Sequence, residues 1–320
     1  MDLSELGEFG FIERMRSWLP EGSAVAGIGD DAAVMRTGDG GLIVAATDAL
    51  VEGTHFRLDW SDPSDVGFKS VSVNVSDVAA MGACPRWLLL ALGAPPETSE
   101  EVLRGLYAGI DDACREYRTE LVGGDTVRAP VLTLAVTVIG SVDGEPVRRS
   151  GAEVGDVLAV TGPLGRAAVG VNLLLSQDAK AVIPEDAIAC MDAHRRPRAR
   201  LDAGTHLRSI GAHAAIDISD GLASDARRLA GASGVGVEID LDLVPVAPEA
   251  RRVAEARSWD IEPLVLGGGE DFELLVALPL EALDKADWIE IGRVVPEGLT
   301  LVRNGERAEL PDAGYDNFAR

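Results

Sequence analysis

The chain has 320 residues, of which 47% are hydrophobic, so it can bury a sizeable core, and its length favours two domains over one. Its 29 basic and 53 acidic residues give a formal net charge of −24, which argues against non-specific binding to nucleic acid or to an anionic membrane. No apolar run reaches the roughly 18 to 20 residues that span a bilayer, and no signal-peptide pattern is found, so we expect a cytoplasmic protein without a membrane partner.

Hydrophobic periodicity in the first half of the chain predicts a mixture of α and β elements. Helices are expected over residues 3–19, 64–81 and 100–117, and strands over residues 41–47, 88–92 and 131–141. The periodicity stops in DGEPVRRSGAEVGD, residues 143–156, where glycine, proline and charged residues accumulate. A domain boundary is therefore predicted there, which gives domains at residues 1–147 and 148–320.

A second mixed unit follows this boundary. A strand is expected in VLAVTG and a helix after Pro163, and AAIDISDGLASDARRLAG reads as a strand that leads into a helix. Further strands are expected in VGVEIDLDL, FELLVAL and WIEIGRVV. The three cysteines, Cys84, Cys114 and Cys190, are widely spaced and are expected as core or half-buried thiols.

Aspartates recur beside Gly, Ser, Thr or Ala at the ends of short apolar runs. They stand in GIGDD, TDAL, NVSD, VGGD and DISD, as Asp30, Asp48, Asp77, Asp125, Asp217 and Asp220. Any one of them alone is ordinarily a helix cap or a turn residue. Brought together in a partly dry site they would repel one another unless cations intervened, and oxygen ligands without His or Cys favour Mg²⁺ or Mn²⁺. Since magnesium commonly shares its ligands with substrate phosphates, the pattern suggests a nucleoside triphosphate site.

The usual lysine-containing phosphate loop is missing, because none of the three lysines follows a glycine. Gly123–Asp125 and Gly267–Asp271 could instead present backbone N–H groups to phosphate oxygens, although either run could be a plain tight turn. Arg148 and Arg149, at the predicted boundary, could reach a phosphate or form a solvated surface pair.

Taken in order, these motifs resemble those of the thiamine-monophosphate kinase family, within the superfamily of the aminoimidazole ribonucleotide synthetase fold. The matching segments span nearly the whole chain: GIGDDAAV, TDALVEGTHF, NVSDVAAMGACPRW, GGDT, RSGAEVGD, DISDGL and GGGEDFELL. The resemblance implies a two-domain α/β (α+β) fold, with an N-terminal mixed sheet that forms a barrel across a homodimer axis and a C-terminal α/β domain. It also implies direct transfer of the γ-phosphoryl group of ATP to thiamine monophosphate, with several Mg²⁺ ions, to form thiamine diphosphate and ADP.

The resemblance also implies roles for individual residues. Magnesium ligands would be Asp30, the Ala46 carbonyl, Thr47, Asp48, Asp77, Asp125, Asp217 and Asp220, and the catalytic set would be Asp30, Asp48, Asp77, Asp125 and Asp217. ATP contacts would be Tyr107, Gly124, Asp125, Arg149 and Ser219. Substrate contacts would be His55, Glu270 and one C-terminal aromatic residue, Phe318 or Tyr315. His194, His206 and His213 match no motif and are expected as surface or packing residues.

Other members of the superfamily are the alternatives. Selenophosphate synthetase needs a reactive Cys or Sec near the N-terminus, and the carbamoyl-dehydrating hydrogenase maturation factor needs a C-terminal cysteine, whereas the first cysteine here is Cys84 and the chain ends YDNFAR. The purine-pathway cyclo-ligase is an alternative ATP-dependent function, although its motifs differ from GIGDDAAV and VEGTHF. A catalytically silent acidic protein that binds divalent cations or serves as an assembly scaffold is the alternative from another class.

Overall fold

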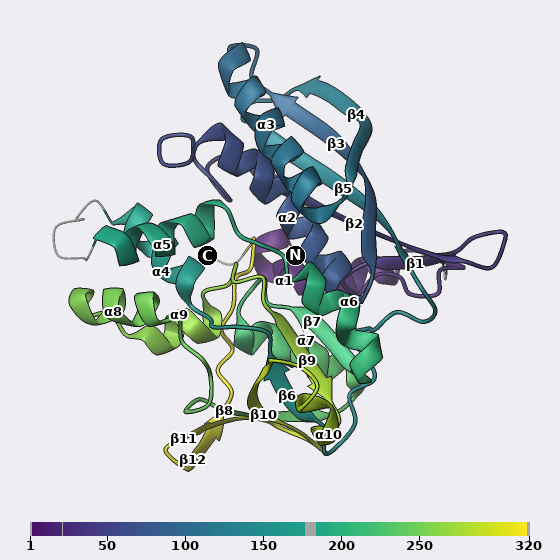
Figure 1. Ribbon diagram of the computed structural model, residues 1–320, viewed down its shortest axis with the longest axis vertical. Helices are drawn as coiled ribbons and strands as arrows, with labels where there is room; N and C mark the ends of the chain where they lie inside the picture. The colour runs from purple at the N-terminus through teal and green to yellow at the C-terminus, as the bar shows by residue number, and fades with distance from the viewer. Residues whose placement is uncertain (1, 21, 177–183, 319–320) are drawn as a thin grey trace.

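The computed structural model describes residues 2–20, 22–176 and 184–318, and it contains two β-sheets that lie one above the other along the long axis of the molecule (Figure 1). The first sheet pairs antiparallel except between β3 and β4, which are parallel. Its strand order is β1 (Ala33–Arg36), β2 (Leu42–Val51), β5 (Thr133–Val142), β3 (Cys84–Ala94) and β4 (Glu120–Arg128).

Helices α2 (Pro63–Ala80) and α3 (Glu100–Tyr117) cover one face of the first sheet. They approach closely because glycines face each other across the contact: a Cβ on Gly109 would lie 1.8 Å from the carbonyl oxygen of Ser64, and one on Gly67 would lie 2.0 Å from that of Leu106. Helix α2 is therefore buried on nearly all sides. The opposite face of the sheet leaves apolar side chains exposed, among them Trp87, Leu89, Val122 and Val127.

The second sheet has seven strands and is covered on both faces. Its strand order is β12 (Glu306–Glu309), β11 (Leu299–Arg303), β8 (Gly236–Asp240), β10 (Ile289–Val295), β6 (Val157–Val160), β9 (Leu274–Leu278) and β7 (Ala214–Asp217). Strands β6, β7 and β9 are buried along their whole length, which explains their continuous apolar sequences. One face packs on α7 (Leu222–Ser233), and the other on α6 (Leu201–Ile210), on α10 (Leu280–Leu283) and on the end of α2.

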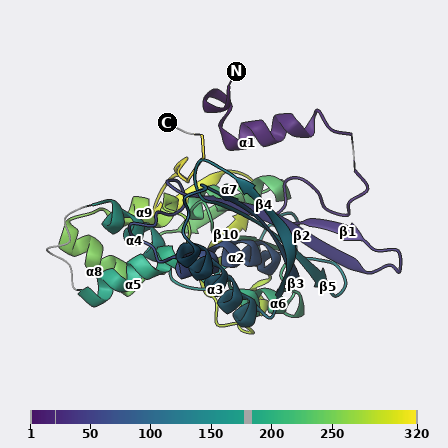
Figure 2. The same cartoon turned by 90° about the horizontal axis from the view of Figure 1, so that it is seen from above.

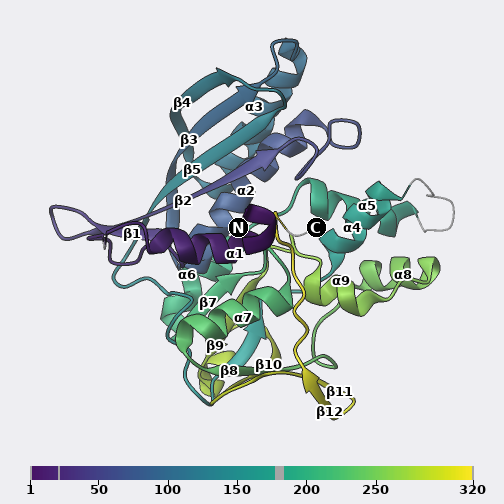
Figure 3. The same cartoon turned by 180° about the vertical axis from the view of Figure 1, so that it is seen from behind.

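The remaining helices lie beside these layers. Helices α4 (Arg166–Leu175), α5 (Pro184–Arg195), α8 (Pro248–Arg257) and α9 (Ile261–Gly267) pack together in a lobe at the left of Figure 1. Helix α1 (Leu3–Arg16) has no buried residue; Figure 2 shows it outside the packed layers, and Figure 3 shows it crossing the front of the molecule beside the C-terminal segment.

The predicted elements are confirmed with shifted ends. Helix 100–117 has the predicted bounds, and helix 3–19 ends earlier, at Arg16, where the chain turns. The sequence reasoning missed β1, β4, α5, α6, α8, α9, α10, β11 and β12. Residues 143–156 contain no helix or strand, and the boundary between residues 147 and 148 remains a prediction. Cys114 and Cys190 are buried and Cys84 is half-buried, as expected. Among the described residues, no helix is both long and apolar enough to cross a bilayer.

Candidate active site

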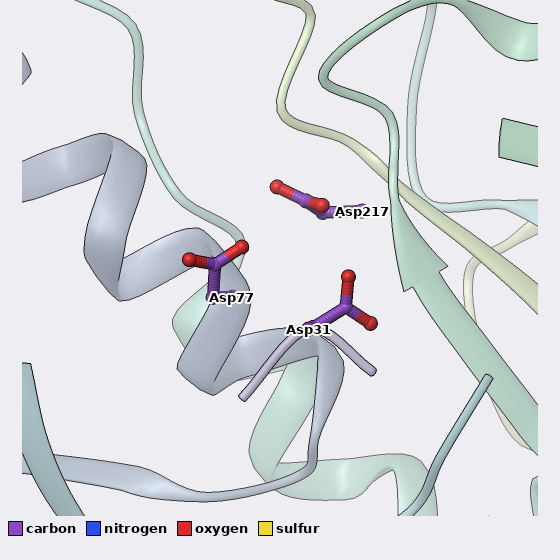
Figure 4. Close-up of side chains that lie close together, drawn as sticks. All are labelled: Asp31, Asp77 and Asp217. Carbon is purple, nitrogen blue, oxygen red and sulfur yellow. The ribbon is translucent and has the colours of Figure 1, made fainter. Parts of the chain in front are cut away.

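Three carboxylates from distant parts of the sequence converge where α2 meets β7 (Figure 4). Asp31 lies in the loop before β1, Asp77 lies in the last turn of α2, and Asp217 is the last residue of β7. One carboxylate oxygen from each lies within 4.8 Å of the others. Asp31, Asp77 and Asp217, hereafter the acidic cluster, thus bring both halves of the chain to one place.

Neighbouring side chains hold the acidic cluster in position. Ser76, one residue before Asp77 on the buried helix α2, donates a hydrogen bond of 2.6 Å from its hydroxyl to Asp217 Oδ2. The loop that carries Asp31 turns at Gly29, whose φ of 113° is in the left-handed region that favours glycine. The packing of α2 against β7 therefore fixes two of the carboxylates, and the glycine turn brings in the third.

Arg149 reaches the acidic cluster from the segment between the two sheets. Its Nε and Nη2 both donate to Asp31 Oδ1, at 3.0 and 2.5 Å. Asp30 points elsewhere, since its Oδ1 accepts the backbone N–H groups of Arg149 and Asp31, both at 3.1 Å. The acidic pair Asp30–Asp31 was predicted as part of the metal site, with Asp30 as the ligand. The structure instead places Asp31 in the acidic cluster, and Asp30 holds the loop against the linking segment.

Burial and mutual repulsion make the acidic cluster hard to ionise. Loss of hydration, opposed by Arg149 and reinforced by Asp217, raises the pKa of Asp31 to about 7. Burial likewise raises the pKa of Asp217 to about 6, against the hydrogen bond from Ser76. The pKa of Asp77 is raised well above its usual range by burial and by nearby carboxylates. Burial alone would lower the pKa of Arg149, but the surrounding carboxylates raise it, so Arg149 stays charged.

The acidic cluster suits a hard divalent cation. Three carboxylates face one guanidinium, so the cluster carries excess negative charge when it is ionised. Asp31 Oδ2 is buried and has no hydrogen-bond partner in the part of the chain that the structure describes. A buried oxygen without a partner is costly, and an oxygen-seeking cation such as Mg²⁺ would satisfy it.

Two further predicted ligands lie near the acidic cluster without belonging to it. Burial raises the pKa of Asp48, on β2, to about 6, and the negative charges of Asp220, Glu8 and Asp31 contribute. Asp220 follows β7 and pairs with Arg228. The backbone N–H of Asp48 donates to Asn74 Oδ1 at 2.9 Å, which ties β2 to α2.

Two predicted oxygen ligands on β2 belong to the pairing of β2 with β5. Thr47 Oγ1 donates to the Val136 carbonyl at 3.0 Å and accepts from Thr137 Oγ1 at 3.1 Å. Ala46 pairs with Val138.

The GGDT motif lies elsewhere in this single chain. Gly124 and Asp125 are exposed residues of the edge strand β4, a strand where a turn was considered, and Asp125 accepts the backbone N–H of Thr126 at 2.8 Å. Across the sheet the register runs from Asp125 through β3 and β5 to Ala49 of β2, three strand spacings or about 14 Å from the strand that carries Asp48. Tyr107 is on α3 and is 42% exposed. The structure does not bring Tyr107, Gly124 or Asp125 to the acidic cluster.

A second polar group surrounds Glu270, in the loop between α9 and β9. Its Oε1 is 2.6 Å from the Nζ of Lys69, and its Oε2 is hydrogen-bonded to Nδ1 of His194. Lys69 also donates to the carbonyl oxygen of His55 at 3.2 Å. His55 and Glu270, both predicted substrate contacts, are thus linked through Lys69. His194, expected as a surface or packing residue, is buried and bonded to Glu270.

The loop that carries Glu270 packs directly on the DISD motif. The backbone N–H of Glu270 donates to the Ser219 carbonyl at 2.8 Å, so this group is already used and is not offered to a phosphate. Gly269 has φ 65°, and a Cβ there would lie 2.5 Å from the same oxygen. Glycine in this run therefore serves the close approach of two loops.

The C-terminal segment and α1 close one side of this region. The backbone N–H of Tyr315 donates to the Asp220 carbonyl at 2.9 Å, and burial raises the pKa of Tyr315, with Glu270 and Glu8 contributing. The side chain of Asn317 donates to the Glu8 carboxylate at 2.7 Å. Of the two predicted C-terminal aromatic residues, Tyr315 is thus near enough to Glu270 to feel its charge. Phe318 follows three residues later and is 37% exposed.

Comparison with known proteins supports one family. The chain matches the family models described as AIR synthase related protein, N-terminal domain, over residues 29–142, and AIR synthase related protein, C-terminal domain, over residues 153–303. The thiamine-monophosphate kinase of Mycobacterium tuberculosis (strain H37Rv) is 38% identical over 321 residues, which cover 99% of this chain and 93% of that protein. The chain belongs to the thiamine-monophosphate kinase family.

Other similarities within the thiamine-monophosphate kinase family cover both chains almost completely. The Escherichia coli (strain K12) enzyme is 38% identical over 98% of each chain. A solved structure of AaThiL complexed with AMPPCP and TMP has 36% identity and a TM-score of 0.90 over 99% of each chain. The two-domain fold expected from the motifs is thereby confirmed.

Three residues of this thiamine-monophosphate kinase family member, Asp31, Lys69 and His194, were missed as site residues. Asp31 could not be told from its neighbour Asp30 by residue type. Lys69 carried a usable signal, because it stands in VGFKSVSVNVSDVAA, a helix without a polar face, and a lysine in such a helix must be paired. His194 lies on α5, which the sequence reasoning did not predict, so no local pattern marked it.

Proposed function

We propose that the protein transfers the γ-phosphoryl group of ATP to thiamine monophosphate and forms thiamine diphosphate and ADP, the last step of thiamine diphosphate biosynthesis. The observation that carries the proposal is the full-length similarity to a structure described with AMPPCP and TMP, at a TM-score of 0.90. The buried acidic cluster supports it, because a reaction between two phosphorylated molecules needs positive charge between them, and a divalent cation held by the three carboxylates would supply that charge.

We propose that Asp31, Asp77 and Asp217 hold Mg²⁺, and that Asp48 and Asp220, next to the acidic cluster, provide further ligands. Bound there, Mg²⁺ would neutralise phosphate oxygens of both substrates. The orphaned Oδ2 of Asp31 and the raised pKa values of the three carboxyls support this assignment. Arg149 holds Asp31 in place through its two bonds to Oδ1, and it leaves Oδ2 for the ion. Of the other predicted ligands, Asp30, Ala46, Thr47 and Asp125 remain proposals.

The substrate side would be formed by Glu270 and His55, as the motifs predict. The carboxylate of Glu270 is ionised, because Lys69 and His194 outweigh the effect of burial and lower its pKa to about 2. It would repel a phosphate and attract the positively charged thiazolium and the amino group of thiamine monophosphate. The acceptor phosphate is already deprotonated near neutral pH, so we assign no general base.

We also propose a homodimer that forms through the exposed face of the first sheet. Large apolar side chains gather on this face, including Trp87, Leu89, Val122 and Val127. An apolar face of this kind on a sheet with an unpaired edge strand, β4, suits a second copy of the chain. Such a dimer would also bring Gly124 and Asp125, on the edge strand β4, next to the second copy, where they would contribute to an ATP site. Tyr107 lies on α3, on the other face of the sheet, and stays a predicted ATP contact. The use of ATP supports a cytoplasmic location.

The test is to incubate the purified protein with ATP, Mg²⁺ and thiamine monophosphate and to separate the products by chromatography. We expect thiamine diphosphate and ADP in equal amounts, and none in a parallel reaction that contains EDTA. If thiamine or another monophosphate were phosphorylated in its place, or if ATP were hydrolysed without transfer, the proposed substrate would be wrong.

A further inference from the structure

Lys69 is a buried cation directed at the proposed substrate site. Its side chain is 1% exposed in the middle of α2, and its Nζ lies 2.6 Å from Glu270 Oε1 and 3.2 Å from the His55 carbonyl oxygen. A lysine so buried is retained only when it is paired, because an isolated ammonium loses several kcal/mol of hydration. Lys69 therefore links the two segments that carry His55 and Glu270.

His194 holds the other oxygen of the same carboxylate. Its Nδ1 is bonded to Glu270 Oε2, and its side chain is 6% exposed. The side chain of Glu270 is 27% exposed, whereas those of Lys69 and His194 are 1% and 6% exposed, so Glu270 is the one of the three that a ligand can reach. Each carboxylate oxygen has a second lone pair, which leaves Glu270 able to accept a hydrogen bond from a ligand on its open side.

We propose that Lys69 and His194 are positioning residues, which hold the Glu270 carboxylate ionised and in one orientation so that it selects an acceptor molecule with a cationic, amine-bearing ring. This inference rests on the proposed function and adds the source of its substrate selectivity. Lys69 acts through Glu270, and in addition it fixes the backbone of His55.

The charges around Glu270 support this role. Loss of hydration would raise the pKa of Glu270, but Lys69 and His194 lower it to about 2, so it is ionised near neutral pH. His55 and Tyr315 also face Glu270; burial lowers the pKa of His55 and raises that of Tyr315, so both are neutral near pH 7. Glu8 acts on both of these residues and Asp220 acts on Tyr315, so the charges around Glu270 on its open side are negative. This side would bind the positive ring end of thiamine monophosphate and leave the phosphate free for the metal side.

Lys69→Met tests the proposal, since methionine fills similar space without charge. We expect the KM for thiamine monophosphate to rise at least about tenfold, the loss typical of one bond to a charged group, while the KM for ATP stays within about twofold. The ratio of variant to wild-type KM should increase as the pH falls from 8 to 5.5, because Glu270 without its lysine takes up a proton. His194→Gln should raise the KM for thiamine monophosphate by less than Lys69→Met does. The matched controls are Lys285→Met and His206→Gln, which make the same changes at exposed positions.

A double variant keeps the test valid if Lys69→Met unfolds the protein. Lys69→Met with Glu270→Gln removes both charges, so no buried charge is left alone, and it should bind thiamine monophosphate no worse than Glu270→Gln. Calorimetric binding of thiamine monophosphate should follow the same order as KM. The inference would be overturned if the two changes raised the KM for thiamine monophosphate independently, so that their effects multiplied in the double variant. It would also be overturned by an unchanged KM in a folded Lys69→Met protein. Neither result would overturn the proposed function. A wild-type protein that neither binds nor phosphorylates thiamine monophosphate would overturn the proposed function with it.

Discussion

Replacing Asp77 with asparagine should make the metal-free protein more stable, although it removes a proposed ligand. The acidic cluster places carboxylate oxygens within 4.8 Å, and two unit charges at that distance repel by about 3.5 kcal/mol at an effective dielectric constant of 20. The raised pKa values mean that the folded protein already relieves part of this repulsion by binding protons. We therefore expect Asp77→Asn to raise the free energy of unfolding by about 1 to 2 kcal/mol at pH 8 in EDTA.

With Mg²⁺ bound, the wild type should become more stable than Asp77→Asn. At a hundred times its dissociation constant, Mg²⁺ would stabilise the wild type by about 2.7 kcal/mol, and Asp77→Asn should lose most of this gain together with turnover. Calorimetric melting at pH 8, in EDTA and in excess Mg²⁺, measures both differences, each expected to shift Tm by a few degrees, about 2 to 4 °C per kcal/mol. Asp287→Asn, at an exposed turn, is the matched control. A variant that melts below the wild type in EDTA, or that gains as much from Mg²⁺, would refute the reasoning.

Three other outcomes are expected. Burial and neighbouring charge raise the pKa of Asp31 to about 7 and that of Asp217 to about 6. The stability that these protonated carboxyls contribute is therefore full below a pH of about 4 and is lost as the pH rises through 6 to 7. The Mg²⁺-dependent rise in Tm should be small at pH 5 and grow by pH 8, and a flat profile would contradict this. Arg149→Met leaves Asp31 buried without its partner and should cost about 3 kcal/mol by urea denaturation in EDTA, where a neutral result would show that the pair is not needed. Gly109→Ala should lower the free energy of unfolding by about 1 to 3 kcal/mol in the same assay, because the added Cβ has no room. Gly231→Ala, where a Cβ would meet nothing within 4 Å, should raise it by up to about 1 kcal/mol. Equal effects of the two changes would argue against the close approach of α2 and α3.

The sequence predicted the kind of site, a cluster of carboxylates, better than it predicted which aspartates form it. Acidic motifs from both halves were expected to meet, and Asp77 and Asp217 do lie together. Which of two adjacent aspartates enters the cluster depends on the turn at Gly29 and on Arg149, which is more than a hundred residues away in the chain, and no local pattern contains this information.

Other features required the three-dimensional arrangement. Strand β4 was missed because its exposed residues show no alternation of apolar and polar side chains, and its two glycines suggested a turn. The contact of Glu270 with Lys69 and His194 joins the loop before β9 to α2 and α5, which are distant in sequence, and α5 was not predicted. Elements with a strong apolar period, such as α3 and β5, were predictable because their burial follows from their own sequence.

The central claim is that a divalent cation lies among Asp31, Asp77 and Asp217 and brings the two substrates together. The most direct test is an anomalous difference map from crystals grown with Mn²⁺, a non-hydrolysable ATP analogue and thiamine monophosphate. We predict a strong peak within coordination distance of oxygens from all three aspartates, close to the terminal phosphate of the analogue. Ordered nucleotide and substrate with no anomalous peak at the acidic cluster would contradict the claim.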